Sequence, residues 1–200
     1  MSHDPKQFWT ERTRQVLQQG RGKMFNRDYE VGSLAPDRVK WVQEQLLLQP
    51  KLPRVLEIGC GFGRWSSALL GHYTSFTGVD VVPERIDRAS SEWGSDSTHF
   101  QVIPADGVWD IEEKFDVVLF VTVLQHLPLQ TACSLLQTAI KHLEPGGVLL
   151  LVEWQFHNKT PQEVAQIAHA EHMFPKPMVE LQKAIPDMTW TGGAGGYIVR

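Results

Sequence analysis

The chain has 200 residues, of which 42% are hydrophobic, and it carries a formal net charge of −4 at pH 7. This length and composition suit one hydrophobic core, so we expect a single domain. The acidic balance, with no long run of basic residues, disfavours a nucleic-acid partner. Two cysteines, an N-terminus without an apolar signal segment and no apolar run long enough to span a bilayer favour a cytoplasmic protein with reduced thiols and no membrane contact.

Two helices are predicted ahead of the first strand. The first covers residues 5–19, with Pro5 at an early position and Gly20 as its stop. The second runs from Pro36 to Pro50 and has apolar residues at helical spacing on one face. Covering one face of a sheet is the simplest role for this second helix.

A strand, a tight turn and a helix follow, and the rest of the chain is organised around them. Val55 to Ile58 is a run rich in apolar β-formers, glycines stand at positions 59, 61 and 63, and residues 65–70 can form a helix. Glycine allows positive φ and lets a ligand lie against the main chain, while the N–H groups of the following helix favour a negatively charged group. The stretch is therefore predicted to be a ligand-binding turn.

The turn does not fit a dinucleotide well. Glu57 lies just before it, where its carboxylate would repel a pyrophosphate and attract a cationic group. The third glycine is Gly63, and the last position of the dinucleotide pattern G-x-G-x-x-G is Arg64. A zwitterionic or cationic ligand suits this turn better than a nicotinamide dinucleotide.

Strands and helices alternate after this turn. Short links between them predict right-handed crossovers in an α/β fold, with a doubly wound parallel sheet and helices on both faces. The predicted elements are strands at residues 75–80, 99–103 and 115–120, a crossover helix at 131–143, a sharp turn at 143–147, a strand at 148–152, helices at 161–173 and 176–184, and a strand pair at 188–190 and 197–199.

The segment Val55-Leu-Glu-Ile-Gly-Cys-Gly-Phe-Gly63 resembles motif I of the class I S-adenosylmethionine-dependent methyltransferases, in which an acidic residue ends the first strand and a G-x-G-x-G turn follows. Leu143-Glu-Pro-Gly-Gly147 is similar to the turn before this family's fifth strand. Five strands plus a closing hairpin agree with the family's Rossmann-like, mostly parallel seven-stranded sheet. The resemblance implies S-adenosyl-L-methionine as cofactor, S-adenosyl-L-homocysteine as product, and in-line transfer of a methyl group to a small-molecule acceptor.

The resemblance also implies which residues contact the cofactor. An acid at the end of the second strand, here Asp80, binds the ribose hydroxyls in this family, although an acid before Pro83 can equally cap a helix. An acid after the third strand, here Asp106, accepts a hydrogen bond from adenine, although Asp106-Gly107 would also suit a surface turn. The simple explanation of Cys60 is a small side chain that fits the turn. The predicted cofactor-binding residues are Glu57, Gly59, Cys60, Gly61, Asp80, Val81, Asp106, Gly107, Val121 and His126.

His126 is the first candidate for a catalytic general base, because it follows the fourth strand near the expected position of the methyl group and an imidazole titrates near neutral pH. A structural histidine that packs on the cofactor or caps the next helix is the alternative. Glu153, at the end of the fifth strand, and His157 are the second choices. His169 and His172 have a spacing that can chelate a metal, but no carboxylate-rich motif accompanies them, so solvated side chains and no metal are expected.

The domain is expected to divide into three parts. Residues 51–153 form the cofactor-binding core, residues 1–50 a helical lid, and residues 154–200 the acceptor-side helices and the closing hairpin. Ligands bind beyond the carboxyl ends of the strands in an open α/β sheet, so the first and last parts are left to enclose the acceptor.

Both outer parts are rich in aromatic and apolar side chains, which suit a small, partly apolar acceptor. We expect it near Tyr29, His126, Glu153 and His157. Covering the outer helices is an equal alternative for Phe8 and Trp9. The side chains in question are Phe8, Trp9, Phe25 and Tyr29 before the core, and Trp154, Phe156, His157, Met173 and Phe174 after it.

Two other functions stay open at this level. One is a nicotinamide-dependent oxidoreductase, which Glu57 and the missing last glycine of the dinucleotide pattern disfavour. The other is a module that binds S-adenosylmethionine without turnover. A comparison of S-adenosylhomocysteine binding with NAD binding distinguishes a methyltransferase from the oxidoreductase. A methyl-transfer assay distinguishes it from the module without turnover.

Overall fold

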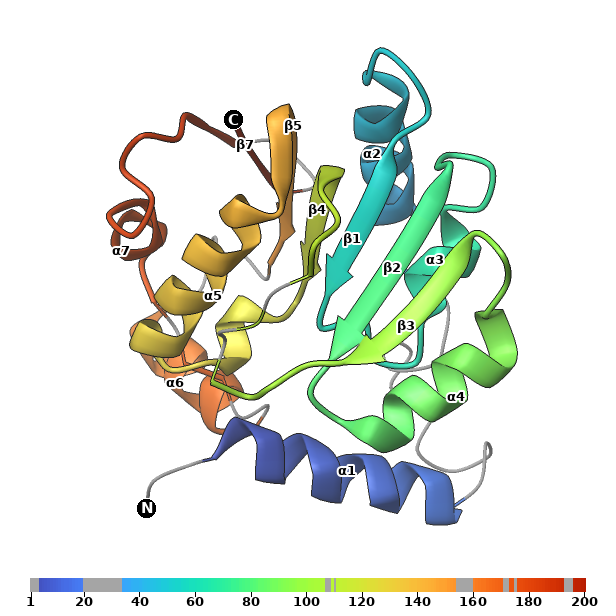
Figure 1. The fold of residues 1–200 in the computed structure, drawn as a ribbon. Helices are drawn as coiled ribbons and strands as arrows, with labels where there is room; N and C mark the ends of the chain where they lie inside the picture. Colours follow the sequence, from blue (N-terminus) through green and yellow to red (C-terminus); the bar gives the residue numbers. More distant parts are fainter. Residues whose placement is uncertain are drawn as a thin grey trace.

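A computed structural model of the chain describes residues 4–19, 34–106, 109, 111–153, 160–170, 173–174, 176–192 and 196–200. The described strands form one seven-stranded sheet in the order β3-β2-β1-β4-β5-β7-β6, with helices around it (Figure 1). The elements are α1 (Pro5–Gln19), α2 (Pro36–Leu47), β1 (Arg54–Ile58), α3 (Arg64–Ala68), β2 (Ser75–Asp80), α4 (Pro83–Trp93), β3 (Thr98–Val102), β4 (Phe115–Val121), η1 (Leu124–His126), α5 (Leu129–Lys141), β5 (Leu143–Val152), α6 (Pro161–Ala170), α7 (Met178–Gln182), β6 (Trp190–Gly192) and β7 (Tyr197–Val199).

The sheet is parallel from β3 to β5, and β7 is antiparallel to both β5 and β6. The predicted doubly wound, mostly parallel seven-stranded fold is confirmed. β1 and β4 lie side by side, while the chain continues from β1 to β2 on one side and from β4 to β5 on the other. Such a reversal of strand order leaves a crevice at the carboxyl ends of these strands, where ligands bind in open α/β sheets.

Helices bury apolar residues against both faces of the sheet. On one face, Val42 of α2 and Leu69, directly after α3, belong to a core that also contains residues of β1, β4 and β5. On the other face, Leu136 of α5 and Leu181, in α7, pack in a second core. Because both faces of the central strands are covered, these strands are largely apolar, as their sequences predicted. The charged exceptions are Arg54 and Glu57 in β1, Asp116 in β4 and Glu144 in β5.

Helix α1 is not part of either face. Figure 1 shows it lying across the carboxyl ends of the strands, beside α4. An ion pair joins Arg14 Nε of α1 to Glu84 Oε1 of α4 at 3.2 Å, and Arg85 Nε donates to Thr13 Oγ1 at 2.7 Å. The predicted first helix therefore forms, and it crosses the end of the sheet where a ligand is expected.

The start of β5 differs from the prediction. Residues 143–147 were expected to form a sharp turn before a strand at 148–152, but β5 begins at Leu143, which pairs with Phe115. The register then shifts between Phe115 and Val117, and Gly146 has φ of +82°. The Pro-Gly-Gly segment is thus accommodated as a bulge inside the strand, because pairing resumes on both sides of it.

The other differences concern the ends of elements. Helices α3 and α7 are shorter than predicted, and the first strand of the closing hairpin is Trp190–Gly192 rather than residues 188–190. No helix in the described part of the chain is both long and apolar enough to cross a membrane. The predicted cytoplasmic location stays a prediction.

Candidate active site

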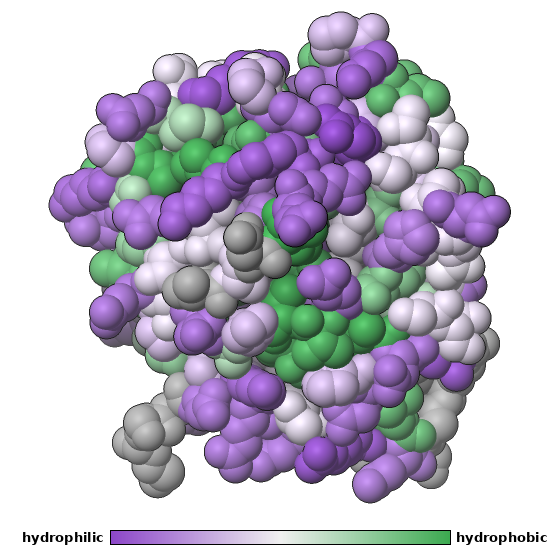
Figure 2. All heavy atoms as spheres, viewed as in Figure 1, coloured by the Kyte–Doolittle hydropathy of each residue, from purple (hydrophilic) through white to green (hydrophobic). Residues whose placement is uncertain are grey.

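A pocket of about 470 Å³ lies where α1 crosses the ends of β1, β2 and β4. Figure 2, viewed from the same side as Figure 1, shows hydrophobic residues gathered near the middle of the visible surface, above the position of α1 and surrounded by hydrophilic residues. The described residues that line the pocket come mainly from α1, the glycine turn, the end of β2, the segment from β4 through η1, and α5. Others come from α2, α4, the segment 103–105 and Met173. Residues far apart in sequence therefore meet at the predicted edge of the sheet.

The glycine turn presents its backbone to the pocket. Gly59 has φ of +75°, and a Cβ there would lie 2.5 Å from a methyl carbon of Val123, so a larger residue does not fit. Gly61 has φ of +57°, and a Cβ there would meet no atom closer than Arg85 Nη1 at 3.6 Å. A side chain at position 61 would therefore extend into space that is open to a ligand.

Glu57 combines deep burial with an unused oxygen. Its side chain is 1% exposed and lines the pocket, and Oε2 has no hydrogen-bond partner among the described residues. Burial raises the pKa of this carboxyl well above its ordinary value, and the Asp80 charge raises it further, whereas Arg64 lowers it. A cationic ligand group placed here would give the orphaned oxygen a donor and favour its ionised form. The ammonium group of S-adenosylmethionine has this chemistry, so the site fits the predicted cofactor.

Asp80 is held in place by the backbone around it. Oδ2 accepts from Gly61 N at 3.0 Å, and Oδ1 accepts from Val82 N at 3.0 Å just before α4. The side chain is 6% exposed and lines the pocket. A carboxylate can accept about four hydrogen bonds, so this local role leaves capacity for ligand hydroxyls.

The chain bends sharply after β4. Thr122 has φ of +54°, a conformation that is rare for a β-branched residue and that occurs most often at functional sites. The 3₁₀ turn η1 follows, and its His126 Nε2 lies 3.2 Å from Gln125 Nε2. When the Gln125 amide donates this hydrogen bond, His126 Nε2 carries no proton and acts as the acceptor. The His126 ring also meets the Trp9 ring edge to face, with 4.9 Å between centroids.

Glu153, a predicted catalytic residue, has a different environment from Glu57. Its oxygens accept from Val123 N and Leu124 N at 3.0 Å and from Gln125 N at 3.2 Å, and it is not among the described residues that line the pocket. Burial raises its pKa to about 7, although these three hydrogen bonds and Lys176 lower it. Its carboxyl group is therefore turned to the backbone of the loop that carries His126.

The remaining predicted residues fall into three groups. Cys60, Val81 and Val121 line the pocket, and burial raises the pKa of the Cys60 thiol, which makes it a poor nucleophile. Asp106 is exposed and is not among the described residues that line the pocket, although the preceding residues 103–105 are. Its contact with adenine stays a prediction. The residues that fall outside the described part of the chain are Phe25, Tyr29, Gly107, Trp154, Phe156, His157 and His172.

Sequence reasoning missed four arginines that line the pocket: Arg12 of α1, Arg38 of α2, Arg64 of α3 and Arg85 of α4. Arg85 is 9% exposed, and its Nη2 has no hydrogen-bond partner within the part of the chain that the structure describes. A basic residue in the first turn of a predicted helix gives no sign of burial in the sequence. In the described residues, no three His, Cys, Asp or Glu side chains come together in a way that could hold a metal ion.

Comparison with known proteins supports the reading of motif I. The model of a family described as a methyltransferase domain matches residues 27–184. The chain belongs to this methyltransferase domain family. The predicted methyltransferase family is thereby confirmed, and the nicotinamide-dependent alternative is not favoured.

Curated relatives match over part of the chain. The ubiquinone biosynthesis O-methyltransferase of Pseudomonas entomophila is 30% identical over 115 residues, which are 56% of this chain and 48% of the relative. That of Coxiella burnetii is 29% identical over 116 residues, which are 57% and 48% of the two chains. The chain thus spans about half the length of the curated relatives that it matches.

Solved structures agree along most of the chain. The amino pentose methyltransferase CalS10 of Micromonospora echinaspora, solved with S-adenosylmethionine bound, has a TM-score of 0.66 at 16% identity, covering 93% of this chain and 94% of its own. The DhpI-SAM-HEP complex has a TM-score of 0.61 at 18% identity, covering 100% and 97%. At these identities the similarity establishes the Rossmann-like methyltransferase fold.

Proposed function

We propose that this chain binds S-adenosylmethionine in the pocket at the ends of β1, β2 and β4 and transfers its methyl group to a small molecule. The observation that carries the proposal is the unpartnered oxygen of buried Glu57 beside the open glycine turn. Glu57 would take the cofactor's ammonium group, Gly61 would let the ligand approach the main chain, and Asp80 would accept the ribose hydroxyls. The cofactor supplies an electrophilic methyl group on a sulfonium, which needs no further activation by the protein.

The acceptor lies, in this proposal, under α1 beyond the cofactor. The side chains in support are apolar, come from four separate parts of the chain and line the same pocket: Trp9, Leu127, Leu135 and Met173. Trp9 and Met173 come from the two outer parts of the chain that were expected to enclose an acceptor. Such a lining favours a partly apolar molecule and keeps water away from a reactive sulfonium.

His126 is our candidate for the general base. It lines the pocket, and Gln125 orients its ring while Trp9 covers it. Relatives named O-methyltransferases make a hydroxyl the first acceptor group to test. A hydroxyl must lose its proton during transfer, whereas a group that arrives deprotonated needs no base.

Glu153 acts, we propose, as a positioning residue rather than as a base. Its three hydrogen bonds satisfy the N–H groups of the loop that carries His126. From the other side, Lys176 Nζ donates to Leu124 O at 2.8 Å and Phe174 N donates to Gln125 O at 2.6 Å. The loop is therefore held by residues that follow β5.

Calorimetry and a methyl-transfer screen test the proposal. S-adenosylhomocysteine should bind the full-length chain and NAD should not. Methyl transfer from labelled S-adenosylmethionine should then be found in a panel of phenols, other hydroxyl compounds and amines. Binding without transfer to any acceptor would favour the non-catalytic module, and failure to bind S-adenosylhomocysteine would contradict the proposal itself.

A further inference from the structure

Arg85 has surroundings that local structure does not explain. It lies in the first turn of α4, is 9% exposed and lines the pocket. In the described part of the chain, no carboxylate lies within ion-pair distance of its guanidinium, and Nη2 is buried without a hydrogen-bond partner. Leaving a buried guanidinium donor unsatisfied is costly, so a partner from outside the chain is indicated.

The guanidinium is nevertheless held in one place. Its carbon Cζ lies 4.7 Å from the centre of the Trp9 ring and 5.3 Å from that of Phe62. Nε donates to Thr13 Oγ1 at 2.7 Å, and Thr13 Oγ1 in turn donates to Trp9 O at 2.7 Å. Two rings and one hydroxyl fix the plane of the fork and leave its outer nitrogens for a ligand.

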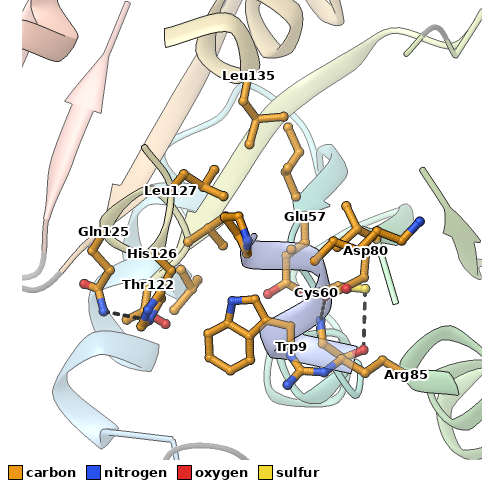
Figure 3. Close-up of a pocket in the computed structure, with 18 of the residues that line it drawn as sticks. Trp9, Glu57, Cys60, Asp80, Arg85, Thr122, Gln125, His126, Leu127 and Leu135 are labelled. Carbon is orange, nitrogen blue, oxygen red and sulfur yellow. Dashed lines mark hydrogen bonds between the residues drawn. The ribbon is translucent and has the colours of Figure 1, made fainter. Parts of the chain in front are cut away.

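The position of these nitrogens identifies which part of the cofactor they meet. Nη1 lies 3.6 Å from the point where a Cβ of Gly61 would stand, and Gly61 N donates to Asp80 Oδ2. Arg85 and Asp80 therefore border the same corner of the pocket, on either side of the glycine turn. Figure 3 shows both residues on the same side of the Trp9 indole, with His126 on the opposite side.

Donor and acceptor chemistry agree with this placement. A ribose hydroxyl carries one O–H donor and two acceptor lone pairs, and an ionised Asp80 can only accept. A guanidinium can only donate. A hydroxyl that donates its proton to Asp80 still has lone pairs that can accept from Arg85. The two residues together would recognise both the donor and the acceptor of one ribose hydroxyl.

We propose that Arg85 is a further cofactor-binding residue: its guanidinium donates to a ribose hydroxyl oxygen of S-adenosylmethionine and at the same time holds α1, through Trp9 and Thr13, over the bound cofactor. This inference rests on the proposed binding of S-adenosylmethionine in the pocket. It adds that cofactor binding and the position of α1 are coupled through one side chain.

The test compares Arg85→Met with Arg14→Met in the full-length protein. Arg14 makes a second α1–α4 contact, an ion pair with Glu84 at the surface, and is not among the described residues that line the pocket. It therefore controls for the chemistry of the substitution and for weaker docking of α1. The ligands are S-adenosylhomocysteine and 5′-methylthioadenosine, which keeps the ribose but lacks the amino acid. Calorimetry measures both affinities.

Arg85→Met should weaken both ligands by about 10- to 100-fold, the loss typical of a hydrogen bond from a charged donor, whereas Arg14→Met should change either by less than about threefold. Without ligand, Arg85→Met should unfold at or above the wild-type temperature, because it removes a buried unpaired charge. If this variant does not fold, Arg85→Lys, which keeps the charge but loses the planar fork, should show the same direction of loss.

Hydrogen exchange provides the second measurement. S-adenosylhomocysteine should slow exchange of the α1 amides in the wild type, and in Arg85→Met it should protect the glycine turn but not α1. Unchanged affinity of Arg85→Met for both ligands would overturn the proposal. A loss of affinity confined to S-adenosylhomocysteine would also overturn the ribose contact, because it would show that Arg85 contacts the amino acid part of the ligand. Neither result would touch the proposed function, which fails only if the wild type does not bind S-adenosylhomocysteine.

Discussion

Glu57 and Glu153 are buried carboxyls on β1 and directly after β5, and their surroundings assign them different roles. Glu57 keeps an oxygen without a partner in the pocket, whereas the oxygens of Glu153 accept three backbone N–H groups. A buried polar atom that lacks a hydrogen-bond partner can receive one from a ligand. A carboxylate whose oxygens are already hydrogen-bonded to a loop stabilises that loop instead. At the scale of single residues, hydrogen-bond satisfaction separates binding from positioning.

We expect Glu57→Gln to weaken S-adenosylhomocysteine binding by about tenfold or more, because the ammonium group loses a charged acceptor. Stability without ligand should not fall, since a buried carboxyl is replaced by a neutral amide. Calorimetric titration measures the first effect and thermal unfolding the second. The matched ligand is 5′-methylthioadenosine, which lacks the ammonium group and should bind the variant as it binds the wild type. Equal losses for both ligands would place Glu57 away from the ammonium group.

At the scale of elements, the glycine turn contains two positions with opposite requirements. A Cβ at Gly59 would collide with Val123, whereas one at Gly61 has room but points toward the ligand space. Both have positive φ, which costs an alanine roughly 1–2 kcal/mol.

Gly59→Ala should therefore destabilise the fold more than Gly61→Ala, and Gly61→Ala should lose more cofactor affinity than its loss of stability explains. Chemical denaturation and calorimetry on both variants check this. Equal stability losses with intact cofactor binding in Gly61→Ala would show that the ligand does not approach the turn at this position.

Helix α1 is the element whose role depends most on tertiary contacts. Its Trp9 lies between Arg85 and His126 and closes one side of the pocket (Figure 3). A lid works by excluding water and holding reactants in register, so its loss should reduce catalysis more than folding.

We expect Trp9→Ala to lower kcat/KM for the accepted substrate by about 10- to 100-fold and to shorten the residence of the cofactor, with the unfolding temperature nearly unchanged. Leu17→Ala, on the same helix but 46% exposed, is the control and should leave kcat/KM unaltered. Steady-state kinetics and stopped-flow dissociation make the comparison. Full activity of Trp9→Ala would contradict the lid.

At the scale of the whole molecule, the carboxyl group of Glu153 links stability to pH. Burial raises its folded-state pKa from about 4.5 to about 7, so the folded protein takes up a proton that the unfolded chain does not bind in this range. The free energy of unfolding should therefore fall as pH rises from about 4.5 to about 7, because the folded state must give up the proton it favours.

Glu153→Gln removes this titration, so its free energy of unfolding should depend less on pH across the same window. Urea denaturation at about pH 5 and about pH 8 measures both proteins. The variant should also lose activity through a displaced His126 loop while keeping its affinity for S-adenosylhomocysteine. Parallel pH dependences of the two proteins would show that Glu153 does not titrate in this range.

The sequence by itself determined the order of strands and helices, the glycine turn and the family, because these rest on local periodicity and on a motif of adjacent residues. Glu57 was predicted to attract a cationic group from its place before the turn, and it lines the pocket together with most of the predicted cofactor residues. The bulge in β5 was missed, because Pro-Gly-Gly suits a turn and a bulge alike and only pairing with β4 decides between them.

Only the tertiary structure decided what lies over the strand ends. Arg85 lines the pocket beneath Trp9 of α1, and Glu153 accepts hydrogen bonds from the loop after β4, which lies against the end of β5. Asp106, predicted from its place after β3, is exposed in the structure, and its contact with adenine stays a prediction. Burial and the partners of a side chain depend on segments distant in the chain, and no local pattern records which of those segments will meet.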